Sequence, residues 1–169
     1  MSMQDKELSI RNGLIDNYNN YAEGLDSKNW PMLRGCFSDD VVIDYGTLVP
    51  PGDDPDAPRD SDDWIKILQG VINGFDITRH TITNHRCVIT DEEVSCRAYL
   101  IADHIIFPSS ETTLIGAADV VTVVGEYSNH YKLVDGVWRI WKSQLAVHWT
   151  SGNLELFPIG QARLAAQQS

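Results

Sequence analysis

The 169-residue sequence has the length of one domain, which we expect to span residues 1–169, and 43% hydrophobic residues can fill one core. Its net charge of −11 argues against nucleic acid and anionic membranes as partners. No apolar run approaches the roughly 18 residues of a membrane span, and the polar N-terminus does not resemble a secretory signal. We therefore expect a cytoplasmic protein.

The first half of the chain is predicted to be mainly helical. Apolar residues recur every three or four positions over about residues 6–25, which is typical of an amphipathic helix. A short helix is expected at 31–37, after a capping residue at Asn29. Another is expected at 64–73, where the polar residues 61–63 supply a start signal.

A strand and a loop are expected between the second and third of these helices. Residues 41–45 are β-branched and aromatic enough to form a strand. The stretch from Pro50 to Pro58 holds four of the seven prolines and is predicted to be an irregular loop.

The second half of the chain has a period of two, which predicts strands. Four long strands are expected, at residues 77–90, 94–107, 118–133 and 137–149. Helices followed by long antiparallel strands indicate an α+β fold, a curved antiparallel sheet with the N-terminal helices on its concave face. Such a fold leaves a cavity for a small ligand. The tail after Ser151 is predicted to be a loop with weak helical turns near 161–166.

His80, on the first long strand, is the main candidate for chemistry. A two-residue hairpin loop would place it opposite Asp103, and a three-residue loop opposite His104, while a bulge would shift this count by one. A histidine beside a carboxylate in a cleft can act as a general base. The alternative is a core histidine that only holds the sheet together.

Three other polar residues have two possible roles each. His85 lies five positions after His80, hence on the opposite face of an unbroken strand, so we expect it to point outward or to pack. Asp26 lies just past the first helix and is either a turn residue or a site residue. Tyr21 is either core or a phenol at the cavity mouth.

The remaining polar residues do not form a recognisable motif. Cys36, Cys87 and Cys96 have no CxxC spacing, so we expect reduced thiols and no zinc site. The histidines show no metal-ligand spacing, and nucleotide-binding and serine-hydrolase motifs are missing. We therefore expect neither metal nor cofactor.

Several stretches together resemble the SnoaL-like group of the nuclear-transport-factor-2-like superfamily. They are Gly24–Asp26, Cys36–Val42, His80–Asn84, Gly125–Tyr131 and Asp135–Trp138. The resemblance covers about residues 8–149 and leaves 150–169 as a tail. It implies a cone-shaped cavity in a cystatin-like α+β barrel and dimers or trimers joined through the outer face of the sheet. Members of this group include scytalone dehydratase, hexachlorocyclohexane dehydrochlorinase and bile acid 7α-dehydratase.

The resemblance also implies roles for particular residues. The catalytic histidine and aspartate of these enzymes match His80 and Asp26, which would form a dyad. The substrate-binding positions that it implies are Tyr21, Asp103 and His104, and we add Tyr45 and Tyr127 as further candidates for binding the substrate. The arginine that the bile acid enzyme has on its last strand finds no match in residues 144–148.

These observations predict a cofactor-independent lyase or isomerase of the dehydratase, dehydrohalogenase or cyclase type. Its His80–Asp26 dyad would remove a proton from a small, largely apolar cyclic substrate. The alternative is a non-catalytic protein, either a small-ligand binder or a partner like the β subunits of ring-hydroxylating dioxygenases. Such a protein needs the cavity but not the dyad.

Overall fold

The computed structural model describes residues 2–46, 54 and 56–167. Most of the predicted proline-rich loop lies outside these residues, and its last residue, Pro58, begins a short strand. None of the helices in the described part of the chain is long and apolar enough to cross a membrane.

Helix α1 (Met3–Asp26) is the longest helix and begins earlier than predicted. A capping box explains this, because the Ser2 hydroxyl accepts from the Asp5 amide and the Asp5 carboxylate accepts from the Ser2 amide. Its buried apolar side includes Leu14, Tyr18, Tyr21 and Leu25. Asp26 was expected just past this helix and is its last residue.

The next two helices follow their predicted start signals closely. Helix α2 (Trp30–Gly35) is capped by Asn29, whose side chain accepts from the Met32 amide. Helix α3 (Ser61–Ile72) is capped by Asp60, one residue earlier than predicted. It buries Trp64, Ile65, Leu68 and Ile72 on one face.

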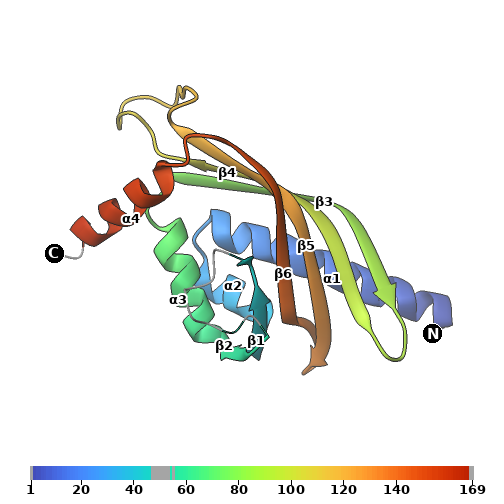
Figure 1. The fold of residues 1–169 in the computed structure, drawn as a ribbon. Helices are drawn as coiled ribbons and strands as arrows, with labels where there is room; N and C mark the ends of the chain where they lie inside the picture. Colours follow the sequence, from blue (N-terminus) through green and yellow to red (C-terminus); the bar gives the residue numbers. More distant parts are fainter. Residues whose placement is uncertain (1, 47–53, 55, 168–169) are drawn as a thin grey trace.

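The six strands in the described part of the chain form one curved, open sheet that bends over α1 (Figure 1). They are β1 (Phe37–Asp44), β2 (Pro58–Asp60), β3 (Ile77–Ile89), β4 (Val94–Ile105), β5 (Val120–Val134) and β6 (Val137–Gly152). Their order is β2-β1-β6-β5-β4-β3. The predicted α+β fold with a curved sheet is confirmed. The pairing is antiparallel except between β1 and β6, which run parallel.

A β-bulge in β3 changes which residues lie opposite one another. Near the turn, Ile89 pairs with Val94, as a two-residue loop requires. The register then shifts between Thr83 and Arg86, where Asn84 has a φ of 57°. As a result His80 lies opposite Ala102, and the predicted pairing with Asp103 or His104 is wrong.

The same bulge returns His85 to the helix side of the sheet. Its ring packs edge-on against Tyr18 of α1, with 5.2 Å between ring centroids. The expectation that His80 and His85 face opposite sides is therefore wrong, because it assumed an unbroken strand. The packing role expected for His85 is confirmed.

Helix α4 (Leu156–Gln167) contains the weak helical turns predicted near 161–166 and extends them into part of the predicted loop. It lies beside α3 (Figure 1). Arg163 forms an ion pair with Asp76 at 2.7 Å, and Phe157 packs against Phe75. Gly160 and Gly74 approach so closely that a Cβ on Gly74 would clash with the Gly160 carbonyl.

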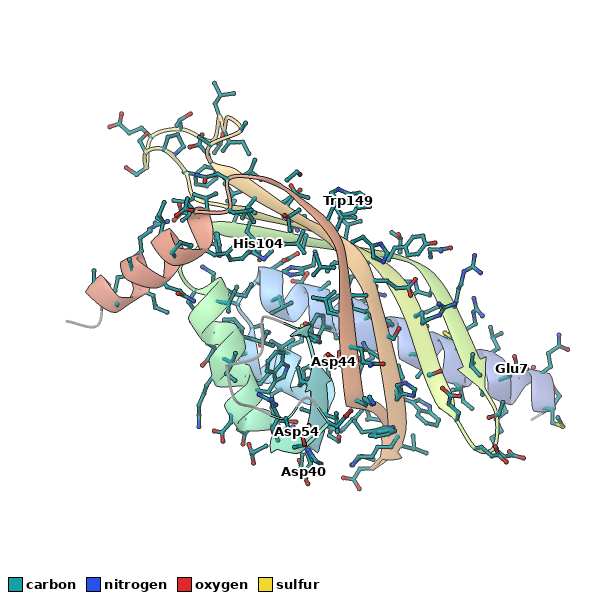
Figure 2. All side chains as sticks on the ribbon, in the orientation of Figure 1. Glu7, Asp40, Asp44, Asp54, His104 and Trp149 are labelled. Atoms are coloured by element: carbon teal, nitrogen blue, oxygen red, sulfur yellow. The ribbon has the colours of Figure 1, made fainter. Side chains whose placement is uncertain are left out.

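The outer face of the sheet carries exposed apolar side chains such as Tyr99, Ile101 and Trp149. Figure 2 shows Trp149 on this outer face and His104 on the side of the helices. Whether the outer face joins copies of the chain, as the resemblance implies, stays a prediction.

Candidate active site

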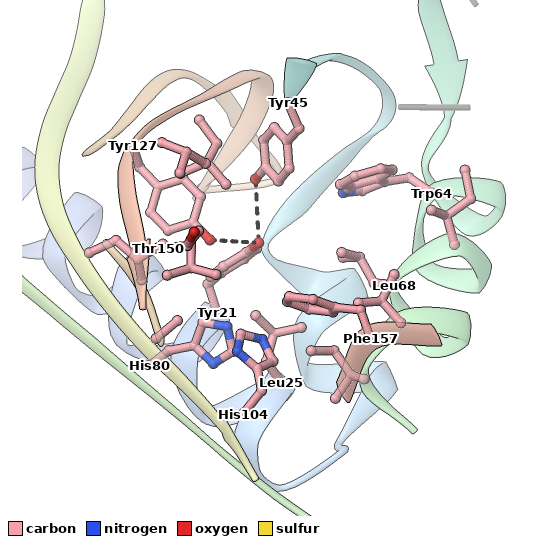
Figure 3. A pocket seen from close by; sticks show the side chains of 18 of the residues that line it. Tyr21, Leu25, Tyr45, Trp64, Leu68, His80, His104, Tyr127, Thr150 and Phe157 are labelled. Carbon is pink, nitrogen blue, oxygen red and sulfur yellow. Dashed lines mark hydrogen bonds between the residues drawn. The ribbon is translucent and has the colours of Figure 1, made fainter. Parts of the chain in front are cut away.

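A cavity of about 350 Å³ lies between the inner face of the sheet and helices α1, α3 and α4. Most of its wall is aliphatic or aromatic, including Leu68 and Trp64 of α3 and Phe157 of α4 (Figure 3). Its polar lining residues are Tyr21, Tyr45, His80, His104, Tyr127 and Thr150. No lysine, arginine, aspartate or glutamate is among the described residues that line it.

His80 and Asp26 meet at one side of this cavity. His80 Nδ1 lies 2.7 Å from Asp26 Oδ1, and the two side chains are only 5% and 9% exposed. Asp26 Oδ2 accepts from the His80 backbone amide at 2.9 Å, and its Oδ1 accepts from the Thr78 hydroxyl at 2.9 Å. The end of α1 thus holds a carboxylate against β3 through three hydrogen bonds.

These hydrogen bonds keep the carboxylate ionised. Burial alone would raise the pKa of Asp26, but the hydrogen bonds from His80 and Thr78 outweigh burial and lower it. An ionised carboxylate only accepts hydrogen bonds, so His80 must carry its proton on Nδ1. In the neutral imidazole this tautomer leaves the other ring nitrogen, Nε2, as the acceptor, and His80 lines the cavity.

His104 is a second histidine of the cavity wall, contributed by β4. Its ring lies edge-on to that of His80, with 5.5 Å between centroids, and also packs against Phe75 and Phe157. Burial, together with the neighbouring His80, lowers the pKa of His104 to about 4. His104 is therefore neutral at physiological pH and adds no positive charge beside the dyad.

Three tyrosines form a hydroxyl cluster elsewhere on the cavity wall (Figure 3). The Tyr21 hydroxyl lies 3.3 Å from that of Tyr45 and 3.5 Å from that of Tyr127. Burial raises the pKa of all three phenols, so they remain protonated. The cluster can donate hydrogen bonds but cannot act as a base.

The direction of these hydrogen bonds follows from Ser143 and Asn129. Ser143 donates its only proton to Asn129 Oδ1 at 2.6 Å, so Tyr45 must donate to Ser143 at 2.9 Å. Tyr21 then donates to Tyr45, and Tyr127 donates to Tyr21 across 3.5 Å, the longest hydrogen bond of the cluster.

Sequence reasoning missed both Ser143 and Asn129. Ser143 and Asn129 are cross-strand partners on β6 and β5, a pairing that a bulge between His130 and Tyr131 makes hard to count from the turn. The available signal was the alternation of Asn129 with Tyr127 and Tyr131 on one face of β5.

Asp103 does not belong to the cavity. Because side chains alternate along β4, Ala102 and His104 face inward and Asp103 faces outward. Its carboxylate accepts from the Thr122 hydroxyl at 2.6 Å. The prediction that Asp103 binds substrate is corrected, because the alternation along β4 turns its side chain away from the cavity. The other predicted substrate residues, Tyr21, Tyr45, His104 and Tyr127, all line the cavity.

Comparison with protein families shows that residues 6–144 match the family described as the SnoaL-like domain. No curated protein sequence matches the chain.

Solved structures share the fold at low sequence identity. The protein Kfla4162 of Kribbella flavida superposes with a TM-score of 0.75 at 22% identity, covering 90% of this chain and 99% of its own. A proposed scytalone dehydratase of Novosphingobium aromaticivorans gives 0.69 at 21%, covering 89% and 96%. The hexachlorocyclohexane dehydrochlorinase LinA-type3 of Novosphingobium barchaimii gives 0.67 at 17%, covering 90% and 95%.

Proposed function

Because this chain belongs to the SnoaL-like domain family, we propose that it is a cofactor-independent lyase or isomerase that uses His80 and Asp26 to move a proton. The observation that carries the proposal is the buried contact of 2.7 Å between His80 Nδ1 and Asp26 Oδ1 beside an apolar cavity. A carboxylate fixed in this way orients the ring and balances the charge that the ring gains.

In the proposed reaction, His80 Nε2 takes a proton from a substrate carbon next to a carbonyl or a leaving group. The electrons of the broken C–H bond form a carbon–carbon double bond, while hydroxide or halide departs or the carbonyl oxygen becomes an enolate. The resulting imidazolium is stabilised by the Asp26 carboxylate. His104 stays neutral and does not compete for the proton.

The Tyr127 hydroxyl is proposed to donate to the oxygen or leaving group that becomes negative. Its proton is held within the tyrosine cluster only by the 3.5 Å hydrogen bond to the Tyr21 hydroxyl, the longest of the cluster, so a substrate oxygen can take its place as the acceptor. A buried hydrogen-bond donor stabilises such a negative charge more strongly than a donor in water does, because solvent does not screen the interaction.

The lining limits the class of substrate. With no charged side chain apart from the dyad at the described cavity wall, a carboxylate or phosphate on the substrate would be buried without a partner. We therefore infer an uncharged, largely apolar cyclic substrate. The lack of a basic residue on the cavity side of β6 disfavours acidic bile acid derivatives in particular.

The test is turnover of uncharged cyclic hydroxy ketones and chlorinated cyclohexanes in deuterated water. Mass spectrometry would detect loss of water or chloride, and NMR would detect exchange of a carbon-bound proton. We expect His80→Ala to lower the rate about 10²- to 10⁴-fold, the usual contribution of a general base.

Asp103→Asn is the matched control, since it changes a carboxylate outside the cavity. Equal turnover by wild type and His80→Ala would refute the proposed role of His80. A non-catalytic ligand binder, the alternative function, would bind such compounds without any exchange. A ligand binder would need the cavity but would not need the buried contact between His80 and Asp26.

A further inference from the structure

We propose that Cys87 and Cys96 are a thiol pair that oxidises reversibly to a disulfide between strands β3 and β4. This site is separate from the dyad and lies near the hairpin turn, beyond the bulge at Asn84. All three cysteines of the described chain are free in the structure.

The strand register brings the two cysteines together. Cys87 and Cys96 lie directly opposite each other, nine positions apart in sequence, and their Sγ atoms are 2.7 Å apart. The turn is closed by a bond from the Thr90 amide to the Glu93 carbonyl. Thr90 and Glu93 are thus a hydrogen-bonded pair, and hydrogen-bonded and non-hydrogen-bonded pairs alternate along an antiparallel ladder. Cys87 and Cys96, three pairs further from the turn, are therefore a non-hydrogen-bonded pair.

That class of pair suits a disulfide. Opposite residues at non-hydrogen-bonded positions have Cα atoms about 4.5 Å apart, which lies within the range that disulfides span. The bond can therefore form without moving the strands apart or breaking a ladder hydrogen bond.

The two thiols differ in accessibility, which assigns their roles. Cys96 is fully buried against the core, whereas Cys87 is partly exposed. The contact with Cys96 lowers the pKa of the Cys87 thiol, and the nearby positive charge of Arg11 adds to this despite partial burial. Cys87 is thus the thiol that attacks an oxidant, and Cys96 resolves the product.

Glutathione disulfide is sufficient as the oxidant. The Cys87 thiolate attacks one of its sulfurs, forming a mixed disulfide and releasing one glutathione thiolate. The Cys96 thiol then loses its proton and attacks the Cys87 sulfur, releasing a second glutathione. Two protein thiols are oxidised and one glutathione disulfide is reduced to two glutathiones.

Cys36 provides an internal control. It is buried between α1 and α2, where its Sγ contacts the carbonyls of Asn17 and Met32. Burial raises the pKa of the Cys36 thiol to about 12, so it should remain reduced.

The experiment is a thiol count on the folded full-length protein after incubation with glutathione disulfide, followed by quenching and denaturation. We expect the three thiols of the sequence to fall to one, with a mass lower by two hydrogens and a peptide linking Cys87 to Cys96. Dithiothreitol should restore all three, and Cys36→Ser should fall from two thiols to none.

Three results would overturn the proposal. They are an unchanged thiol count, a glutathione adduct on Cys87 that persists while Cys96 is present, and a disulfide between two chains on a non-reducing gel. Cys96→Ser should hold such an adduct, because its resolving thiol is missing, and Cys87→Ser should keep both of its remaining thiols.

Discussion

The two polar groups of the cavity are built for different tasks. One, which we term the dyad side, consists of Asp26, His80 and His104, and the other, the tyrosine side, consists of Tyr21, Tyr45 and Tyr127 with Ser143 and Asn129 behind them. The dyad side holds a nitrogen base fixed by a carboxylate. The tyrosine side holds neutral hydroxyls and an amide in a directed chain.

This difference separates acceptance of a proton from donation of a hydrogen bond. Burial keeps the phenols protonated, whereas three hydrogen bonds keep Asp26 ionised despite burial. A substrate between the two groups would lose a proton to one and be stabilised by the other. Substitutions on the dyad side and on the tyrosine side should therefore change different measurable properties of the protein.

The largest effect is expected from Asp26→Asn. A neutral amide cannot balance the charge of a His80 imidazolium, so turnover should fall about 10²- to 10⁴-fold, approaching the loss for His80→Ala. Steady-state kinetics on an identified substrate would measure this, with Asp103→Asn as the control. Full turnover by Asp26→Asn would contradict the proposal that Asp26 and His80 act together to remove the proton.

The second largest effect concerns His104 and pH. The folded pKa of about 4 lies below the 6.5 of the unfolded histidine, so between these values only the unfolded chain binds the proton. This contribution to stability is complete above pH 6.5 and is lost as the pH falls to about 4. The loss should reach about 3 kcal/mol.

Urea unfolding of the wild type and of His104→Gln between pH 4 and 7 would measure that loss. The variant should show a shallower pH dependence than the wild type. Parallel curves for the two proteins would mean that folding does not lower the pKa of His104.

A smaller effect is expected from Tyr127→Phe. Loss of one hydrogen bond to a developing charge should lower kcat about 10- to 100-fold, with KM nearly unchanged. The comparison of kcat with KM makes the test specific, because a packing defect would raise KM instead. The pH dependence of stability should be the same as in the wild type.

The smallest effect is expected from Ser143→Ala. It leaves Asn129 Oδ1 without its donor and Tyr45 without its acceptor, and should lower the free energy of unfolding by about 1–3 kcal/mol. Thermal unfolding would measure this, with Ser128→Ala on the outer face of β5 as the control. An unchanged melting temperature would show that Ser143 does not hold the chain of hydroxyls together.

The two sides were not equally predictable from sequence. Asp26 and His80 could be identified because a family pattern marks both positions, and the tyrosines because aromatic residues stand out on a helix and a strand. Ser143 and Asn129 have no such mark, since their role arises only when β5 and β6 pair. Asp103 was misplaced because the bulge in β3 shifts His80 by one position along β4, from opposite Asp103 to opposite Ala102.

The terminal helix shows a second limit of local reasoning. Pro158 and Gly160 weaken the helical signal of residues 156–167, so the sequence favours a loop there. Contacts with residues distant in sequence stabilise α4 despite its weak helix propensity. They are the Arg163–Asp76 ion pair and the packing of Phe157 on Phe75. Neither contact is visible in a short sequence window.

The bulge at Asn84 also affects how this chain should be aligned with its relatives. A relative that lacks the bulge would need one residue fewer between the position that matches His80 and its hairpin turn, so a correct alignment places a single-residue gap near Asn84. An ungapped alignment would match inward residues of one protein with outward residues of the other over half of β3. Deleting Asn84 should therefore be far more damaging than replacing it with glycine, which accepts its positive φ.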